Sequence, residues 1–322
     1  MDDYTKTVFA HLDYQCVTLW NKNCSWNVQL FHLNLSNFFV LLIFSVGSLL
    51  TVSANMVVIV SIIINKQLHT ATNFIILSLA MSDFLVGGLM MPLQCAMFVD
   101  VCLYHTRSIC PVYNFISTIL GSVSLYNVVL IAIDRYFALC HPFVYVAKMS
   151  LRVVLKCVGF VWLLSLIYNL SIMFIGSSEQ GQTKVICFQT CAIPVNNTWG
   201  LTDFIFSFII PCLLIVILYL RVLTVALRHA KVISDAAKPG INRRKSELKA
   251  TKTLGTVVFV YLLCWIPLYV FLLNIENVPE SNVILHYLMW LFSSNSFINP
   301  IIYAISYPWF KKSLSFCALF RK

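Results

Sequence analysis

Long apolar stretches separated by short polar ones form the dominant pattern of this 322-residue chain. A helix rises about 1.5 Å per residue, so about 20 apolar residues suffice to cross the hydrocarbon core of a bilayer. Gly or Pro interrupts several stretches, which a membrane helix tolerates when its neighbours satisfy the freed backbone groups. The pattern predicts an all-α membrane protein, a seven-transmembrane helix bundle. Its spans are 36–65, 71–97, 107–140, 152–175, 199–227, 252–274 and 283–305.

The same pattern divides the chain into three parts. We expect residues 1–35 to form an extracellular N-terminus, 36–305 the seven-transmembrane domain and 306–322 a short amphipathic helix and cytoplasmic tail. Aromatic, basic and apolar residues alternate at helical spacing after Tyr307, which is typical of a helix on a membrane surface. The N-terminal part lacks a short apolar run with a cleavage site, so the first span is predicted to act as an uncleaved signal-anchor.

Composition and charge agree with a membrane protein and give its orientation. The chain is 60% hydrophobic and 11% charged, whereas soluble domains carry about 25% charged residues. Its net charge of +10 is explained by topology rather than by nucleic-acid binding, because no basic run has interleaved aromatics in a polar context. With the N-terminus outside, all but four of the 22 Lys and Arg residues lie on the inner side, as the positive-inside rule requires. The four exceptions are Lys6, Lys22, Arg107 and Lys184.

Sequons and cysteines sort in the same way. Glycosylation acceptors at Asn23 and Asn196 fall on the predicted outer side, whereas those at Asn34 and Asn169 lie at or inside spans and are expected to stay unmodified. Cys317 lies near the inner surface and is a candidate for palmitoylation. Six cysteines lie outside, where disulfides persist: Cys16, Cys24, Cys102, Cys110, Cys187 and Cys191. These features predict a multi-pass protein of the plasma membrane.

Asp83 lies in the middle of the second span, where a charge is costly and indicates function. Hydroxyl and amide groups on other spans are predicted to surround it. A carboxylate in such surroundings suits a small hard cation, above all sodium, and a water-filled polar cluster without an ion is the alternative. The candidate ion ligands are Asp83, Ser124 and Asn295, with Asn55, Ser296 and Asn299 nearby.

Asp134 and Arg135 end the third span at the inner face, and Glu247 opens the sixth span at the same depth. A pair between Arg135 and Glu247 would hold two helix ends together, and breaking it would let a partner enter. An arginine that merely extends toward the interface is the simpler alternative.

Asp203 lies eight residues before Pro211, and hence in the outer half of the fifth span. An acid that faces the interior of a bundle marks a cation pathway or a cationic ligand. Trp265 and Tyr269 lie at a comparable depth in the sixth span, and aromatic faces beside a carboxylate suit an ammonium group. The alternative is that Asp203 caps the start of the span near water.

Taken together, these motifs resemble those of the rhodopsin-like G-protein-coupled receptors over nearly the whole chain. The motifs are Asn55, LSLAMSDF around Asp83, Cys110 with Asp134-Arg135-Tyr136, Trp162, Pro211 with Tyr219, Cys264-Trp265-Ile266-Pro267 and Asn299-Pro300-Ile301-Ile302-Tyr303. The stretch Asn295–Phe310 resembles the fingerprint of the trace amine-associated receptors, as do Ile233–Ala236 and the spacing of Cys187 and Cys191.

The resemblance implies disulfides, a switch and partners. Cys110 would pair with Cys191, and Cys16 with Cys187, with Cys24 as the competing partner. The partner at the inner face would be a heterotrimeric G protein of the stimulatory, olfactory type. The implied switch residues are Asp134, Arg135, Tyr219, Glu247, Asn299, Pro300 and Tyr303.

One departure from the family pattern concerns the ligand. Most amine receptors carry an aspartate seven residues after the cysteine of the third span, where this chain has Ser117, and Ser293 replaces a tyrosine that often supports that aspartate. Asp203 matches a position where some trace amine-associated receptors, notably a large fish group, carry an acid. The resemblance thus implies that an amine is gripped from the fifth span. The predicted ligand-binding set is Asp203, Ser117, Thr118, Ser122, Ser207, Trp265, Tyr269 and Ser293.

Two other functions remain open at this point. A receptor of the same fold for a non-amine ligand would use Asp203 as a helix cap. A transporter or channel is disfavoured because no internal repeat and no acid–base relay through the bundle is visible. An enzyme is least favoured, since no metal-ligand set or nucleophile–base pair has workable spacing. No cofactor is expected apart from the candidate sodium ion.

Overall fold

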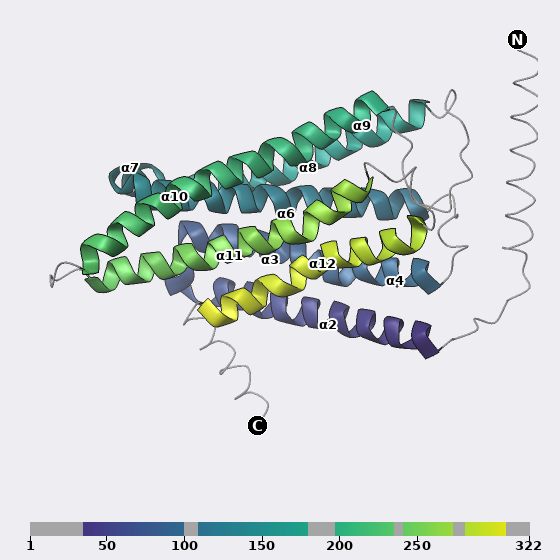
Figure 1. The fold of residues 1–322 in the computed structure, drawn as a ribbon, viewed down its shortest axis with the longest axis horizontal. Coiled ribbons are helices and arrows are strands. Elements are labelled where there is room, and N and C mark those ends of the chain that lie inside the picture. The colour runs from purple at the N-terminus through teal and green to yellow at the C-terminus, as the bar shows by residue number, and fades with distance from the viewer. Residues whose placement is uncertain (1–34, 100–108, 180–196, 235–240, 273–280, 307–322) are drawn as a thin grey trace, which may run out of the picture.

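A computed structural model describes residues 35–99, 109–179, 197–234, 241–272 and 281–306. In this part of the chain the secondary structure is helical throughout, and the long helices lie side by side in one bundle (Figure 1). Two of the seven runs are each divided by a π-helical turn. The runs are α2 (Leu35–Ile64); α3 (Ala71–Leu85), η2 (Val86–Met90) and α4 (Met91–Val99); α6 (Ile109–Cys140); α8 (Leu151–Glu179); α9 (Asn197–Phe204), η3 (Ile205–Ile209) and α10 (Ile210–Ser234); α11 (Ile241–Leu272); and α12 (Ser281–Ser306).

The predicted helix bundle is confirmed. Six helical runs in the described ranges are long and apolar enough to cross a membrane, from Phe38–Ile64 to Gly255–Leu272. The seventh, α12, lies beside α11 and α2, and its buried residues include Ser293, Asn295, Ser296 and Asn299. The helix α11 begins at Ile241 rather than at 252, because its polar first turns are rich in good helix formers. A short helix that the sequence did not predict, α7 (Pro142–Lys148), has Pro142 in its first turn, where proline is well tolerated.

The third span, α6, is the centre of the bundle, since it packs against α3, α8, α10 and α11. About three fifths of its membrane window is buried (61%), compared with 22% for α2 and 17% for α8. The outer faces of α2 and α8 carry exposed apolar side chains such as Phe39 and Phe160, as contact with lipid tails requires. The main core cluster joins α3, α6, α8, α10 and α11, and includes Leu79, Leu125, Val154, Ile215 and Trp265.

The π-helical turn η3 lies directly after Asp203. Such turns insert one extra residue into a helix and are frequent at functional sites. The Ser207 hydroxyl, within η3, donates to the Asp203 carbonyl oxygen at 2.5 Å. The turn therefore places Asp203 and Ser207 next to each other on the inner side of the fifth span.

Several predictions fall outside the described residues and stay predictions. They are the extracellular N-terminus, the disulfides, the two outer glycosylation sites and the C-terminal amphipathic helix. Cys110 belongs to α6, but its side chain is not described. The remaining residues concerned are Cys16, Cys187, Cys191, Asn23 and Asn196.

Candidate ligand-binding site

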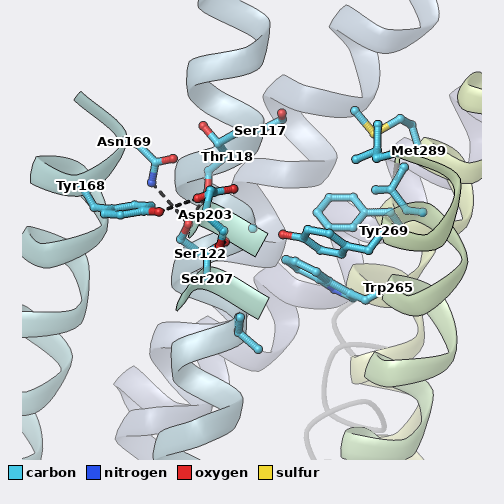
Figure 2. Close-up of a pocket in the computed structure, with 15 residues that line it drawn as sticks. Ser117, Thr118, Ser122, Tyr168, Asn169, Asp203, Ser207, Trp265, Tyr269 and Met289 are labelled. Carbon is cyan, nitrogen blue, oxygen red and sulfur yellow. Dashed lines mark hydrogen bonds between the residues drawn. The ribbon is translucent and has the colours of Figure 1, made fainter. Parts of the chain in front are cut away.

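A cavity of about 200 Å³ lies among α6, α8, the fifth span, α11 and α12 (Figure 2). It collects seven of the eight predicted ligand-binding residues from three helices. Its polar and aromatic lining consists of Ser117, Thr118, Ser122, Tyr168, Asn169, Asp203, Ser207, Trp265, Tyr269 and Phe292, with Gly121, Leu125, Leu268, Leu272 and Met289 completing the wall. The fold thus brings together predicted ligand-binding residues that are far apart along the chain.

Asp203 is the one carboxylate among the described residues of the lining. The Tyr168 hydroxyl on α8 donates to Asp203 Oδ1 at 2.5 Å, and Figure 2 shows the two side chains facing each other. Short hydrogen bonds of this kind to an ionised acceptor are strong and fix geometry. The carboxylate is therefore held in place while remaining part of the cavity wall.

Aromatic rings cover the opposite side of the cavity (Figure 2). Tyr269 stacks on Phe208 with 4.1 Å between ring centroids, and Trp265 contacts Phe292 with centroids 4.6 Å apart. Gly121 permits this packing, since a Cβ there would lie 3.2 Å from both Phe292 Cζ and Trp265 Cη2. The negative faces of such rings attract a cation, so the cavity combines a carboxylate with π surfaces.

The contribution of α8 to the cavity was not predicted from the sequence. Tyr168 and Asn169 both line the cavity, and the Asn169 amide donates to the Ser165 carbonyl at 2.7 Å and to Ser122 Oγ at 3.3 Å. Asn169 is buried within the helix, where no glycan can be attached. The available signal was the spacing of Ser165 and Asn169, which places two polar groups one turn apart on one face of an otherwise apolar span.

Ser293 was predicted to bind ligand, but the structure places it outside the cavity lining. Its side chain is 1% exposed, and its hydroxyl donates to the Met289 carbonyl at 2.8 Å and to Gln94 Oε1 at 3.4 Å. A serine side chain is too short to extend from this buried position past its own helix. Met289, one turn earlier, forms the cavity wall instead.

Asp83 meets an amide from the seventh span, while its pairing with Ser124 and Asn295 stays a prediction. Asp83 is fully buried, and the Asn299 amide donates to its Oδ2 at 2.9 Å. In the part of the chain that the structure describes, five buried oxygens of the predicted set accept no hydrogen bond: Asn55 Oδ1, Asp83 Oδ1, Ser124 Oγ, Asn295 Oδ1 and Asn299 Oδ1. Buried oxygens without donors are costly, and they match the preference of a hard cation for oxygen ligands. The residues present therefore fit a sodium ion.

At the inner end of α6, the Asp134 carboxylate is fully buried and joins three helices. Its Oδ2 accepts from Thr72 Oγ1 at 2.8 Å and pairs with the Arg135 guanidinium, while its Oδ1 accepts from the Tyr145 hydroxyl at 2.9 Å. Burial raises the pKa of Tyr145, and the negative charge of Asp134 raises it further. The hydroxyl therefore stays protonated and keeps donating at physiological pH.

The expected pair between Arg135 and Glu247 stays a prediction. Glu247 belongs to α11, but its side chain lies outside the described part. The contacts of Arg135 include Asp134 on α6 and Thr72 Oγ1 on α3, to which it donates at 2.5 Å. Tyr219 on α10 lies against Gly255 on α11, where an added Cβ would overlap the tyrosine ring.

Comparison with known proteins identifies the class first. Residues 54–303 match the model of the 7 transmembrane receptor (rhodopsin family), which covers most of the chain. The chain therefore belongs to the rhodopsin family of seven-transmembrane receptors, and it is a multi-pass membrane receptor rather than an enzyme.

Within this class the similar proteins are trace amine-associated receptors. Trace amine-associated receptor 13c of Danio rerio is 35% identical over 296 residues, which is 88% of this chain and 86% of that protein. Trace amine-associated receptor 2 of Homo sapiens is 31% identical over 99% of this chain and 92% of its own length. Trace amine-associated receptor 5 of Rattus norvegicus is 34% identical over 84% of this chain and 82% of its own. The chain is a member of the trace amine-associated receptor family.

Proposed function

We propose that this receptor is an olfactory sensor of small protonated amines at the plasma membrane, with its N-terminus outside the cell. It signals through a heterotrimeric G protein of the stimulatory type and raises cAMP. The observation that carries the proposal is Asp203, the one carboxylate in the described cavity lining, facing the rings of Trp265 and Tyr269. An ammonium group satisfies both features at once.

The non-amine alternative also has an observation in its favour. Asp203 already accepts a hydrogen bond from Tyr168, as a carboxylate with a purely structural role would. However, a neutral ligand would leave the negative charge in the cavity without a counter-ion, and an unpaired charge in a desolvated site is costly. An ammonium group removes this cost, which favours the amine.

A panel of amines, each paired with the alcohol of the same carbon skeleton, tests the proposal. In cells that express the receptor and a cAMP reporter, we expect several amines to act and their alcohols to be inactive at 100-fold higher concentration. Stronger responses to alcohols, aldehydes or acids would establish the non-amine receptor. Amine uptake or current without cAMP would instead indicate a transporter or channel.

Ligand binding changes activity only through contacts that differ between the inactive and active states. Trp265 joins the cavity floor to the core, since it stacks on Tyr261 with centroids 4.8 Å apart, and Pro267 interrupts the same helix. Below it lie the Asp83 cluster, where Ser124 and Asn295 would complete the ligands of a sodium ion, and Tyr303. The inner end of the bundle, around Asp134 and Arg135, then opens to the G protein.

Tyr145→Phe is expected to raise ligand-free cAMP about tenfold, because it removes a hydrogen bond to the buried Asp134 carboxylate. Hydrogen bonds to charged groups contribute about 1.5–3 kcal/mol, and the inactive state loses this contribution. Basal cAMP, normalised to receptor at the cell surface, measures the effect. Tyr287→Phe is the matched control, since the Tyr287 side chain is exposed. Equal basal cAMP in the two variants would show that Tyr145 does not restrain the receptor.

A further inference from the structure

The hydroxyl groups that line the cavity share one property: their hydrogens are directed to the protein. Five of the six hydroxyls in the described lining donate in this way. Ser117 and Thr118 donate to the Asn114 carbonyl at 3.3 and 2.8 Å, and Ser122 donates to the Thr118 carbonyl at 2.8 Å. Ser207 and Tyr168 both donate to Asp203, to its carbonyl oxygen and to its carboxylate, at 2.5 Å each.

The amide of Asn169 extends this pattern. Its nitrogen donates to the Ser165 carbonyl and to Ser122 Oγ. A hydroxyl carries one hydrogen and two lone pairs, so a hydroxyl that donates to the protein offers only lone pairs to a ligand. Apart from the Tyr269 hydroxyl and the Trp265 indole N–H, the polar wall of the cavity therefore consists of acceptors.

One of these acceptors, the Tyr168 oxygen, lies beside the carboxylate of Asp203. Tyr168 occupies Oδ1, so Oδ2 is the carboxylate oxygen left for a ligand. The Tyr168 oxygen itself lies 2.5 Å from Oδ1 and keeps its own lone pairs, which makes it a second acceptor beside the charge. An ammonium group at this place meets at least two acceptors rather than one.

The number of N–H groups on the ligand then decides how well it fits. A primary ammonium has three N–H donors, a secondary one two and a tertiary one only one. Each methyl group added to nitrogen removes one N–H donor, so a tertiary ammonium leaves one of the two acceptors without a donor in a desolvated site, which costs as much as leaving a polar group unsatisfied. A methyl group also requires room beside the ring of Tyr168.

We infer that the receptor is selective for primary amines, and that Tyr168 is the residue that sets this selectivity. The inference rests on the proposed amine-sensing function and specifies its ligand class. The Tyr168 hydroxyl acts twice: it fixes Asp203 Oδ1, and it accepts a second N–H of the bound ammonium. The ligand is a primary ammonium whose carbon chain packs toward Tyr269 and Met289.

The experiment compares primary amines with their N-methyl and N,N-dimethyl derivatives on two skeletons, butylamine and 2-phenylethylamine. With the wild-type receptor, the half-maximal concentration for cAMP is expected to rise about tenfold from the primary amine to its N,N-dimethyl derivative. With Tyr168→Phe, the half-maximal concentration of the dimethyl amine divided by that of the primary amine is expected to fall about tenfold. The receptor still responds to amines. The ratio is the useful readout, because a merely structural effect would shift all three derivatives together.

Two further variants complete the test. Thr118→Val keeps the shape of another lining residue but removes its oxygen. It is also expected to lower the ratio of half-maximal concentrations between dimethyl and primary amine. Tyr287→Phe removes an exposed hydroxyl and is expected to leave the ratio unchanged. Equal potency of primary and tertiary amines at the wild-type receptor, or an unchanged ratio in Tyr168→Phe, would overturn the inference and leave amine sensing intact. Responses to alcohols but to no amine would instead overturn the proposed function itself.

Discussion

Replacing Asp203 with Asn is expected to raise the half-maximal concentration of every active amine by about 100-fold or more. Asn has nearly the same shape and its carbonyl oxygen can still accept from Tyr168, but the negative charge is lost. Removing one partner of a desolvated charge pair costs about 2–5 kcal/mol, and about 2.8 kcal/mol corresponds to 100-fold in affinity. Dose–response curves of cAMP against amine concentration measure the change.

Two controls separate loss of the counter-ion from loss of the receptor. Surface expression of Asp203→Asn should match the wild type, because the aspartate lies at a cavity rather than in the packed core. Asp203→Glu keeps the charge but displaces it by one methylene, so its potency should fall between the wild type and Asn. An Asn variant with wild-type potency would show that Asp203 is a structural cap and that the amine binds elsewhere.

The lengths of the apolar runs and the charged residues within them were enough to predict the spans and the depth of the site in the membrane. The span ends at Ile64 and Cys140 lie within one residue of their predicted positions, because Asn65 ends the first apolar run and His141 ends the third. Asp203 and Trp265 could be predicted to line the same cavity, because their distances from Pro211 and Pro267 place them at comparable depths in their spans. A charged residue inside an apolar run is informative because burying it without a partner is so costly.

The lateral contacts could not be predicted, because they depend on how each helix is rotated about its axis. In α8 the side chains of Tyr168 and Asn169 face the cavity, and the one sequence signal for this face is the spacing of Ser165 and Asn169, which does not fix how the helix is rotated. Ser293 was predicted to line the cavity, but its short side chain bonds to its own helix and to Gln94 instead. Sequence alone does not show which of these partners a buried serine takes. The π-helical turn η3 contains Ser207, and Ile205–Ile209 includes no glycine or proline that would indicate an irregular turn.

Gly255→Ala is expected to raise ligand-free signalling at least fivefold. A Cβ at this position of α11 would overlap Oη and Cζ of Tyr219 and lie 2.6 Å from its Cε2, so the ring must leave its place. The tyrosine is a residue that the family resemblance assigns to the inner switch, and in this state it lies against the backbone of α11. Overpacking a close contact costs about 1–3 kcal/mol, which shifts a two-state equilibrium by about 5- to 150-fold. We take the state with Tyr219 against α11 to be the closed one; the added strain then falls on it and the open state gains population.

A double-mutant cycle tests whether this effect passes through Tyr219. In Tyr219→Ala the ring is absent, so adding Gly255→Ala should change basal cAMP little, and the two substitutions should be strongly non-additive. Gly159→Ala on α8 is the matched control, since nothing lies within 4 Å of a Cβ added there. Basal cAMP per receptor at the surface is the measurement for all variants. A Gly255→Ala receptor that behaves like Gly159→Ala, or one whose basal signal rises equally with and without the Tyr219 ring, would show that this contact does not hold the receptor closed.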